Sequence, residues 1–190
     1  MERDGYNFEL RRKLFHALFG FFLIFILYHS TRTNLIIVLT IFLIMGSIII
    51  VLMWQGRNIP IADWFVEKLE RENARFPGYG AFWYVVGILL LALFISNVHA
   101  IAASIVTLAF GDGAATIFGL KGRHPLAYNR RKTIEGSLAF FIFSLPAYLF
   151  VGWMGIVLAA LEAVVEILPT PIDDNLLIPV TAIFIFIIAA

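Results

Sequence analysis

The residues from Gly111 to Gly136 combine glycines, acids and bases between two strongly apolar runs. Asp112 stands at the end of the first run, where a carboxylate is costly to place and usually has a function. Five bases and a Thr-Glu pair follow it within the same segment. A carboxylate that holds a divalent cation, with Lys132 and arginines that bind phosphate, would form a polyphosphate site.

Small residues recur through this segment at helical spacing. Gly111, Ala115, Gly119 and Gly122 fall on one side of a helix, where they permit close approach of a neighbouring helix or of a ligand. Packing alone explains each glycine as well as ligand binding does. The segment is not a P-loop, because it lacks the Gly-x-x-x-x-Gly-Lys-Ser/Thr pattern and follows an apolar helix rather than a strand.

A second polar group precedes the first apolar run. Glu9, Lys13 and His16 share one helix face by their spacing, and Gly20 continues that face one turn deeper. Arg12 and Lys13 have an alternative interpretation as ordinary anchors at a membrane surface. A histidine just inside an apolar run is less ordinary, so His16 is a candidate functional residue.

A third group of acids lies near the end of the chain. Glu162 and Glu166 are one turn apart on a predicted helix, and Asp173, Asp174 and Asn175 open the next helix. Capping of that helix explains one of these three residues. It leaves the other acids unexplained, and oxygen ligands for magnesium are the interpretation that we favour for them.

The composition indicates an integral membrane protein. The 190 residues are 61% hydrophobic and 14% charged, with a mean hydropathy of +0.91. At roughly 20 apolar residues per crossing there is room for about six or seven helices and for no separate soluble catalytic domain. We therefore expect residues 1–190 to form a single membrane-embedded catalytic domain. The chain has no cysteine, which excludes disulfides, thiol nucleophiles and cysteine-based metal sites.

The expected fold is an all-α, polytopic membrane protein with about seven transmembrane helices. The apolar runs that predict them are Leu14–Tyr28, Leu35–Trp54, Ala81–Ile95, Val98–Phe110 with a continuation through Gly119, Glu135–Val151, Trp153–Leu168 and Leu176–Ala190.

An amphipathic helix at the membrane interface is predicted over Ile61–Arg75. Its apolar face comprises Ile61, Trp64, Phe65 and Leu69. Its wet face comprises Asp63, Glu67, Lys68, Glu70, Arg71 and Glu72. Such a helix acts as a connector or lid, or it recognises lipid directly.

The distribution of basic residues predicts the orientation of the chain. Every Lys and Arg except Arg32 lies before the first run, after the second or after the fourth. With alternating helices these positions share one side, so the positive-inside rule places the N-terminus in the cytoplasm and the C-terminus on the opposite side. All three polar groups then end at the cytoplasmic level, where they can form one site.

Taken together, these motifs resemble the CTP-dependent lipid kinases: dolichol or polyprenol kinase, phytol kinase and the CTP-using diacylglycerol kinase. The resemblance covers nearly the whole chain in order. It rests on Glu9, Arg12, Lys13, His16 and Gly20, on the block from Gly111-Asp112 to Lys132-Thr133-x-Glu135-Gly136, and on Glu162, Asp174-Asn175 and Pro179. It implies transfer of the γ-phosphate of CTP to a lipid hydroxyl, with Mg²⁺ or Ca²⁺. The Lys-Thr-x-Glu-Gly element is also similar to one in phosphatidate cytidylyltransferases, which join CTP to a phospholipid.

The resemblance and the side-chain chemistry together imply roles for named residues. The catalytic candidates are Asp112, Lys132 and His16, and the base for the lipid hydroxyl is either Asp112 or His16. The metal candidates are Asp112, Glu166, Asp173 and Asp174, with Glu135 as a further acid. The candidates for binding CTP are Arg12, Lys13, Gly111, Gly119, Gly122, Arg131, Thr133, Glu135, Gly136 and Asn175.

The expected partners are CTP, a membrane lipid alcohol and the bilayer, with no nucleic acid. A wall of Phe, Ile and Leu accepts a polyprenol such as dolichol, phytol or diacylglycerol alike, and the small-residue faces make a homodimer plausible. Two other classes stay open. A small transporter would spread its polar residues through the membrane depth, and a structural assembly factor would bind no nucleotide.

Overall fold

The computed structural model describes residues 2–71 and 74–189 of the chain. Over these residues the chain forms helices and turns, with one isolated bridge between Pro125 and Thr133 and no extended strand. The all-α prediction is confirmed.

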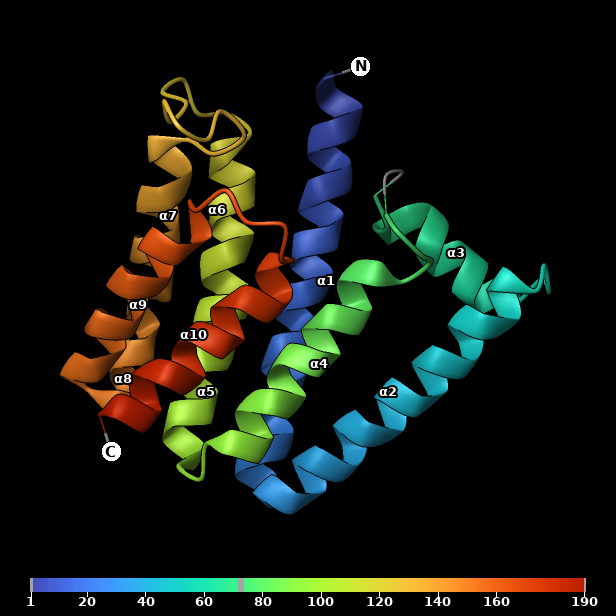
Figure 1. Cartoon of the computed structure of the whole chain (residues 1–190), viewed down its shortest axis with the longest axis horizontal. Helices are drawn as coiled ribbons and strands as arrows, with labels where there is room; N and C mark the ends of the chain where they lie inside the picture. Colours follow the sequence, from blue (N-terminus) through green and yellow to red (C-terminus); the bar gives the residue numbers. More distant parts are fainter. Residues whose placement is uncertain (1, 72–73, 190) are drawn as a thin grey trace.

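The helices follow one another along the chain and are joined mostly by short turns (Figure 1). They are α1 (Glu2–His29), α2 (Arg32–Trp54), α3 (Pro60–Leu69), α4 (Tyr79–Phe94), α5 (Val98–Val106), α6 (Asp112–Gly119), α7 (Ile134–Ser144), α8 (Tyr148–Val151), α9 (Trp153–Glu166) and α10 (Asp174–Ile188). A π-helical turn, Thr107–Gly111, joins α5 to α6, and a 3₁₀ turn, Leu145–Ala147, joins α7 to α8. Each predicted apolar run coincides with one helix or with joined helices, apart from shifts at the ends.

Three helical segments of the described chain are long and apolar enough to cross a membrane. They are Arg32–Trp54, Val98–Gly119 and Ile134–Val151. The helices Tyr79–Phe94 and Asp174–Ile188 are apolar but shorter. These segments indicate a membrane protein, and the number of crossings stays a prediction.

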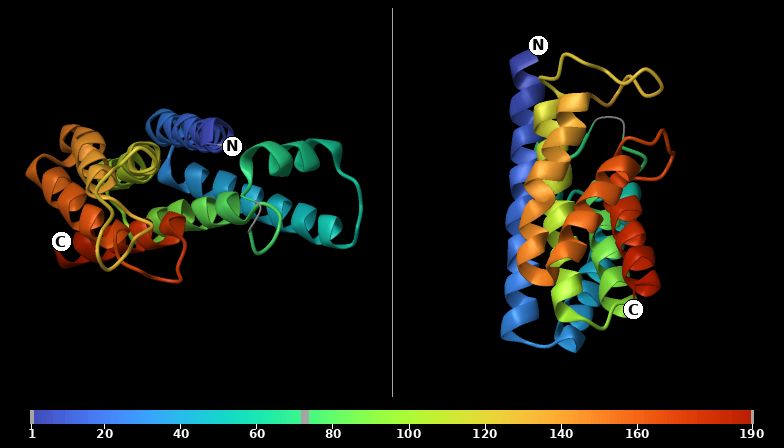
Figure 2. Two further views of the ribbon diagram at one scale, coloured as in Figure 1. Left: turned by 90° about the horizontal axis from the view of Figure 1, so that it is seen from above. Right: turned by 90° about the vertical axis from the view of Figure 1, so that its left-hand side faces the viewer.

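The two ends of the described chain lie at opposite ends of the bundle (Figures 1 and 2). The connections α1–α2 and α4–α5 lie far from the start of α1, whereas the loop between α6 and α7 lies close to it. Successive long segments reverse direction, with α5–α6 and α7–α8 each counting as one segment. The starts of α1, α7 and α10 and the ends of α6 and α9 therefore point toward one end of the molecule. The three polar groups of the sequence are carried there.

The segment Val98–Gly119 forms the centre of the bundle. Its most apolar window is 78% buried, whereas that of α2 is 11% buried. Close packing of α1 against this segment depends on Gly20, because a methyl group there would lie 2.7 Å from Ala109 Cβ. Helix α1 therefore rests directly on the segment that continues into Asp112.

The π-helical turn Thr107–Gly111 ends immediately before Asp112. A turn of this kind inserts one extra residue into a helix, which rotates the following side chains, and it occurs frequently at functional sites. Leu108 and Ala109 are enclosed in the core, whereas Asp112 lines a polar pocket. The turn thus separates the structural part of this long helix from its polar part.

Helix α10 approaches α4 closely at Gly87. A methyl group on Gly87 would lie 2.8 Å from Pro179 Cγ and closer still to the backbone oxygen of Asn175. Only a hydrogen atom leaves room there for the first turn of α10, which carries Asp174 and Asn175.

The substitution Gly87→Ala is expected to lower the free energy of unfolding by about 1–3 kcal/mol, because the overpacked helices must shift apart. Thermal unfolding in detergent, followed by tryptophan fluorescence, measures this loss. The matched control is Gly46→Ala in α2, where a methyl group meets nothing within 4 Å. Equal melting temperatures for the two variants would contradict the proposed contact.

Helix α3 is shorter than predicted. It spans Pro60–Leu69, and Glu70 already has an extended backbone with φ −101° and ψ 143°. Because the helix has ended, Arg71 does not lie on the polar face that the sequence predicted for it. Its guanidinium binds Glu9 of α1 instead. Glu72 lies outside the described residues. The apolar residues Ile61, Trp64 and Phe65 are exposed, and their placement at a membrane interface stays a prediction.

Candidate functional site

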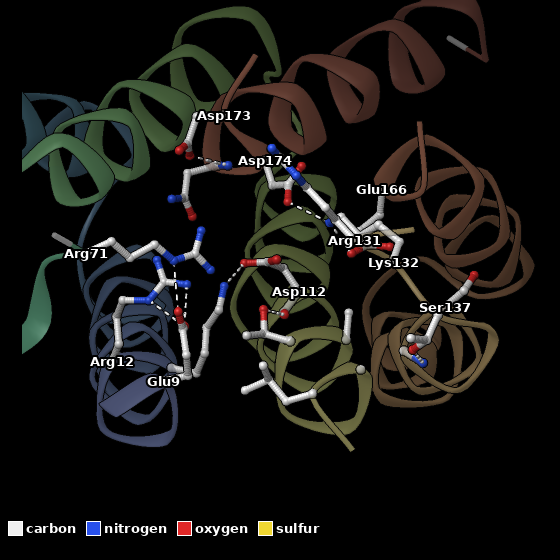
Figure 3. A pocket seen from close by; sticks show the side chains of 18 residues that line it. Glu9, Arg12, Arg71, Asp112, Arg131, Lys132, Ser137, Glu166, Asp173 and Asp174 are labelled. Atoms are coloured by element: carbon white, nitrogen blue, oxygen red, sulfur yellow. Dashed lines mark hydrogen bonds and ion pairs between the residues drawn. The ribbon is translucent and has the colours of Figure 1, made fainter. Parts of the chain in front are cut away.

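A polar cavity of about 350 Å³ lies among α1, α6, α7, the end of α9 and the start of α10 (Figure 3). It collects residues from all three polar groups of the sequence. The sequence-predicted residues that line it are Arg12, Lys13, Asp112, Gly119, Arg131, Lys132, Thr133, Gly136, Glu166, Asp173, Asp174 and Asn175. The expectation that these distant segments meet at one pocket is confirmed by the geometry.

Lys13 and Asp112 form a buried ion pair between α1 and α6. The Lys13 ammonium donates to Asp112 Oδ2, and each side chain is only 4% exposed. The free-energy cost of removing two charges from water often exceeds their mutual attraction, so a buried ion pair is weak evidence for stability. The pair places one cation and one carboxylate in the wall of the pocket.

Lys132 connects the end of α9 to the start of α10. Its ammonium donates to Glu166 Oε1 and to Asp174 Oδ2, the latter at 2.9 Å. Burial alone would lower the pKa of Lys132, but the Asp174 and Glu166 carboxylates outweigh burial and raise that pKa above its ordinary value. Lys132 therefore stays protonated at neutral pH.

A third charged cluster closes the pocket on the side of α1. Arg12 Nη2 lies 2.7 Å from Glu9 Oε2, and Arg71 Nε lies 2.8 Å from Glu9 Oε1. Glu9 and Arg71 both line the cavity, although neither was among the predicted site residues. The sequence could have indicated Glu9, because its helical spacing places it on the same face as Lys13. It could not have indicated Arg71, because the position of Arg71 depends on where α3 ends.

Glycines form the floor of the pocket where α6 meets the start of α7. A methyl group on Gly136 would lie 2.9 Å from the Ala115 carbonyl oxygen and 3.2 Å from Gly119 Cα. Thr133 caps α7, since its hydroxyl oxygen accepts from the Gly136 amide at 3.1 Å. The positive end of the α7 dipole therefore faces the cavity, and this end of a helix favours anions.

Asn175 ties the first turn of α10 to α4. Its side-chain nitrogen donates to the Gly80 carbonyl oxygen at 3.3 Å. Asp173 caps the helix, because its side-chain oxygen accepts from the backbone amide of Asn175 at 3.0 Å. Burial raises the pKa of Asp173. The Asn175 oxygen is buried, has no hydrogen-bond partner and belongs to a residue of the pocket wall.

Other predicted site residues lie outside the pocket lining. Gly111 packs against Phe140 and Ser144 of α7, and Gly122 packs against Thr133 and Glu135. Glu135 accepts from the Arg123 amide at 2.8 Å and lies 2.7 Å from His124 Nδ1.

The contacts of Gly122 and Glu135 order the loop between α6 and α7, and this loop carries Arg131 and Lys132 to the cavity. His16 lines a neighbouring apolar cavity instead of the polar one.

The charges around the pocket balance. Five basic side chains and five acidic side chains line it. Glu9, Asp112, Glu166 and Asp174 each pair with a lysine or arginine. Within the described residues, no group of three or more acids or histidines is close enough to hold a metal ion. Mg²⁺ is usually held by one or two carboxylates together with substrate phosphates, and the acids of this pocket fit that partial role.

Comparison with known proteins gives two relatives. One is an uncharacterised protein of Methanocaldococcus jannaschii, 34% identical over 180 residues that cover 93% of this chain and 92% of the relative. The other is a probable phytol kinase 3, chloroplastic, of Glycine max, 31% identical over 212 aligned positions that cover 97% of this chain and 64% of the plant protein. No protein-family model matches the chain. No solved structure matches it significantly.

Proposed function

We propose that this chain, which belongs to one family with the uncharacterised Methanocaldococcus jannaschii protein, is a membrane lipid kinase. The similarity to a probable phytol kinase supports a kinase. The observation that carries the proposal is the polar cavity, in which Lys13 of α1 and Lys132 of the loop before α7 each pair with buried or half-buried carboxylates.

The proposed donor is the triphosphate of CTP. Lys13, Lys132, Arg12 and Arg131 would neutralise its oxygens, and the start of α7 would face the phosphates through Thr133. Catalysis of phosphoryl transfer consists mostly of such positioning and charge neutralisation. The lipid hydroxyl oxygen attacks the γ-phosphorus, the bond from that phosphorus to the β–γ bridging oxygen breaks, and CDP leaves. The products are the lipid monophosphate, CDP and one proton.

A divalent cation is proposed to enter together with the nucleotide. A pocket with equal numbers of acids and bases cannot by itself compensate a triphosphate, so bound Mg²⁺ or Ca²⁺ would supply the missing positive charge. Asp112, Asp174 and Glu166 are the residues that would hold it, once the phosphates draw Lys13 and Lys132 away from them.

Chelation is expected to abolish transfer, and Mg²⁺ or Ca²⁺ is expected to restore it. Because the pocket acids pair with lysines and arginines, we expect purified protein without nucleotide to retain no metal after gel filtration. Elemental analysis of the eluted protein measures this. One tightly bound divalent ion per chain would contradict entry of the metal with the nucleotide.

The proposal extends to topology. Seven helices would cross the membrane, with the N-terminus and the polar pocket at the cytoplasmic face and the C-terminus on the opposite side, as the charge distribution favours. In this orientation the pocket meets soluble nucleotide on one side and the bilayer laterally. A long-chain alcohol then needs to raise only its hydroxyl to the level of the membrane surface.

The experiment that tests the proposed function uses position-specific labels. Purified protein is incubated with CTP labelled at the α or the γ phosphate, or with ATP, and with phytol, a polyprenol, diacylglycerol or phosphatidic acid. Label that moves from the γ position to an alcohol supports the kinase. An α-label that arrives on phosphatidic acid would instead identify a cytidylyltransferase. The absence of transfer in every combination would overturn the proposal.

A further inference from the structure

A cavity of about 300 Å³ lies among α1, α3 and α4, beside the polar pocket. Its lining is mostly apolar and includes Phe15, Phe19, Phe42, Phe65, Tyr84 and Val85. Its size falls within the range of about 300–1,000 Å³ that is typical of ligand pockets. Phe15 and Phe65 are 42% and 38% exposed, so the rim opens at the surface of the helices that faces the bilayer in the proposed topology.

A second apolar cavity of about 470 Å³ continues the first between α2, α3 and α4. The two share Phe42, Phe65, Ala81 and Val85 as common wall residues. In the other direction, the first cavity meets the polar pocket at Arg12, which lines both. A path with apolar walls therefore leads from the space between α2, α3 and α4 to the edge of the charged site.

His16 lies in the wall of this path and holds an unused hydrogen-bond acceptor. Its side chain is buried, and Nδ1 lies 3.0 Å from the Arg12 carbonyl oxygen. A carbonyl oxygen can only accept, so Nδ1 carries the hydrogen and Nε2 has a free lone pair. Nε2 is buried without a partner. The hydroxyl of Tyr84 is already engaged, because it donates to the His16 carbonyl oxygen at 3.1 Å.

We propose that the two apolar cavities bind the chain of the acceptor lipid alcohol and that its hydroxyl donates a hydrogen bond to His16 Nε2. The inference rests on the proposed function for the identity of the reaction. A buried acceptor without a partner fits a ligand that carries a donor, whereas an acyl ester of the bulk bilayer has none. His16 follows Lys13 by one turn of α1, so the hydroxyl oxygen would lie beside the pocket that holds the phosphates.

The first test measures binding without any nucleotide. Geranylgeraniol that carries a terminal diazirine is irradiated with the purified full chain in detergent, and labelled peptides are mapped by mass spectrometry. Labels are expected on α2, α3 and α4, and excess phytol should remove most of them. Ala81 lines both cavities, so Ala81→Phe fills the space where they meet and is expected to abolish this labelling. Ala160→Phe adds the same bulk to an exposed position of α9 that lines neither cavity, and should leave it unchanged.

The second test separates the role of His16 from packing. His16→Leu removes the acceptor and is expected to raise the KM for the alcohol roughly tenfold or more, since a site built to bind a hydroxyl group depends on that contact. His16→Gln keeps an acceptor and is expected to recover most of the loss, while the KM for CTP stays unchanged in both variants. Equal effects of Leu and Gln would overturn the role of Nε2.

The outcomes distinguish this inference from the proposed function. Competed labelling of the cavities without any phosphoryl transfer would overturn the kinase and leave the binding site standing. Transfer with an unchanged KM for the alcohol in Ala81→Phe, or with labels only on other helices, would overturn the binding site and leave the kinase standing. Labelling that phytol does not displace would identify a bulk-lipid surface and also overturn the binding site.

Discussion

The substitution Lys132→Met is expected to lower phosphoryl transfer by roughly 100- to 1,000-fold, the effect of removing one preorganised electrostatic contact to a transition state. Lys132 is the cation that Glu166 and Asp174 hold between the end of α9 and the start of α10. Its protonated ammonium lies in the wall of the cavity, and in the proposed reaction it turns from the carboxylates to the phosphates of CTP. Steady-state transfer from γ-labelled CTP to geranylgeraniol measures the loss.

The control for Lys132 is Arg130→Met in the same loop. Arg130 is exposed and does not line the cavity, so the variant loses one positive charge without touching the site. Its activity should stay within about twofold of the wild type at physiological ionic strength, where an exposed charge is largely screened. A loss in Arg130→Met as large as that in Lys132→Met would reduce the role of Lys132 to its contribution to net charge.

Asp112→Asn is expected to abolish measurable transfer and also to destabilise the fold. The substitution leaves the Lys13 ammonium buried without its carboxylate, and breaking a buried pair on one side costs about 3–5 kcal/mol. A loss of activity in this variant alone would therefore not separate catalysis from folding. Thermal unfolding and transfer must be measured on the same preparation.

The double variant Lys13→Met/Asp112→Asn separates the two effects. It removes both charges, and replacement of a whole buried ion pair is often neutral or stabilising. Its melting temperature should return toward that of the wild type, while transfer stays absent. Recovery of transfer in the double variant would show that Asp112 acts only by neutralising Lys13.

Much of the architecture follows from the order of apolar runs. Long apolar segments must become helices in a membrane because their backbone polar groups have no other partners, and this fixes helices such as α2 and the segment Val98–Gly119. Alternation of successive helices then predicts that Lys13, Lys132 and Asp174 meet at one end, and the cavity bears this out.

The partners within the site depend on details that periodicity does not carry. The register of α1 on the central helix selects Asp112 as the partner of Lys13, and it depends on the fit of Gly20 against Ala109. The end of α3 at Leu69 frees Arg71 to reach Glu9. A pattern of hydrophobic residues places a helix to within a turn, whereas these contacts depend on shifts smaller than a turn.

Glu135 shows that sequence position alone does not distinguish an acid that binds a ligand from an acid that orders a loop. Its position beside Lys132-Thr133 suggests a ligand for nucleotide or metal, but its carboxylate accepts from Arg123 and lies against His124 in the preceding loop. The loop can order itself because Gly122 leaves room for Thr133 and Glu135. A residue that shapes the phosphate-binding segment has the same sequence signature as one that touches the phosphate.

The most direct test of the account compares single-turnover transfer from γ-labelled CTP to geranylgeraniol by the wild type, Lys132→Met and Arg130→Met. The account predicts labelled lipid monophosphate from the wild type and from Arg130→Met, and almost none from Lys132→Met at matched protein stability. Unchanged transfer by Lys132→Met, or no labelled lipid from the wild type with this or any other alcohol, would contradict the assignment of the polar pocket as the site of phosphoryl transfer.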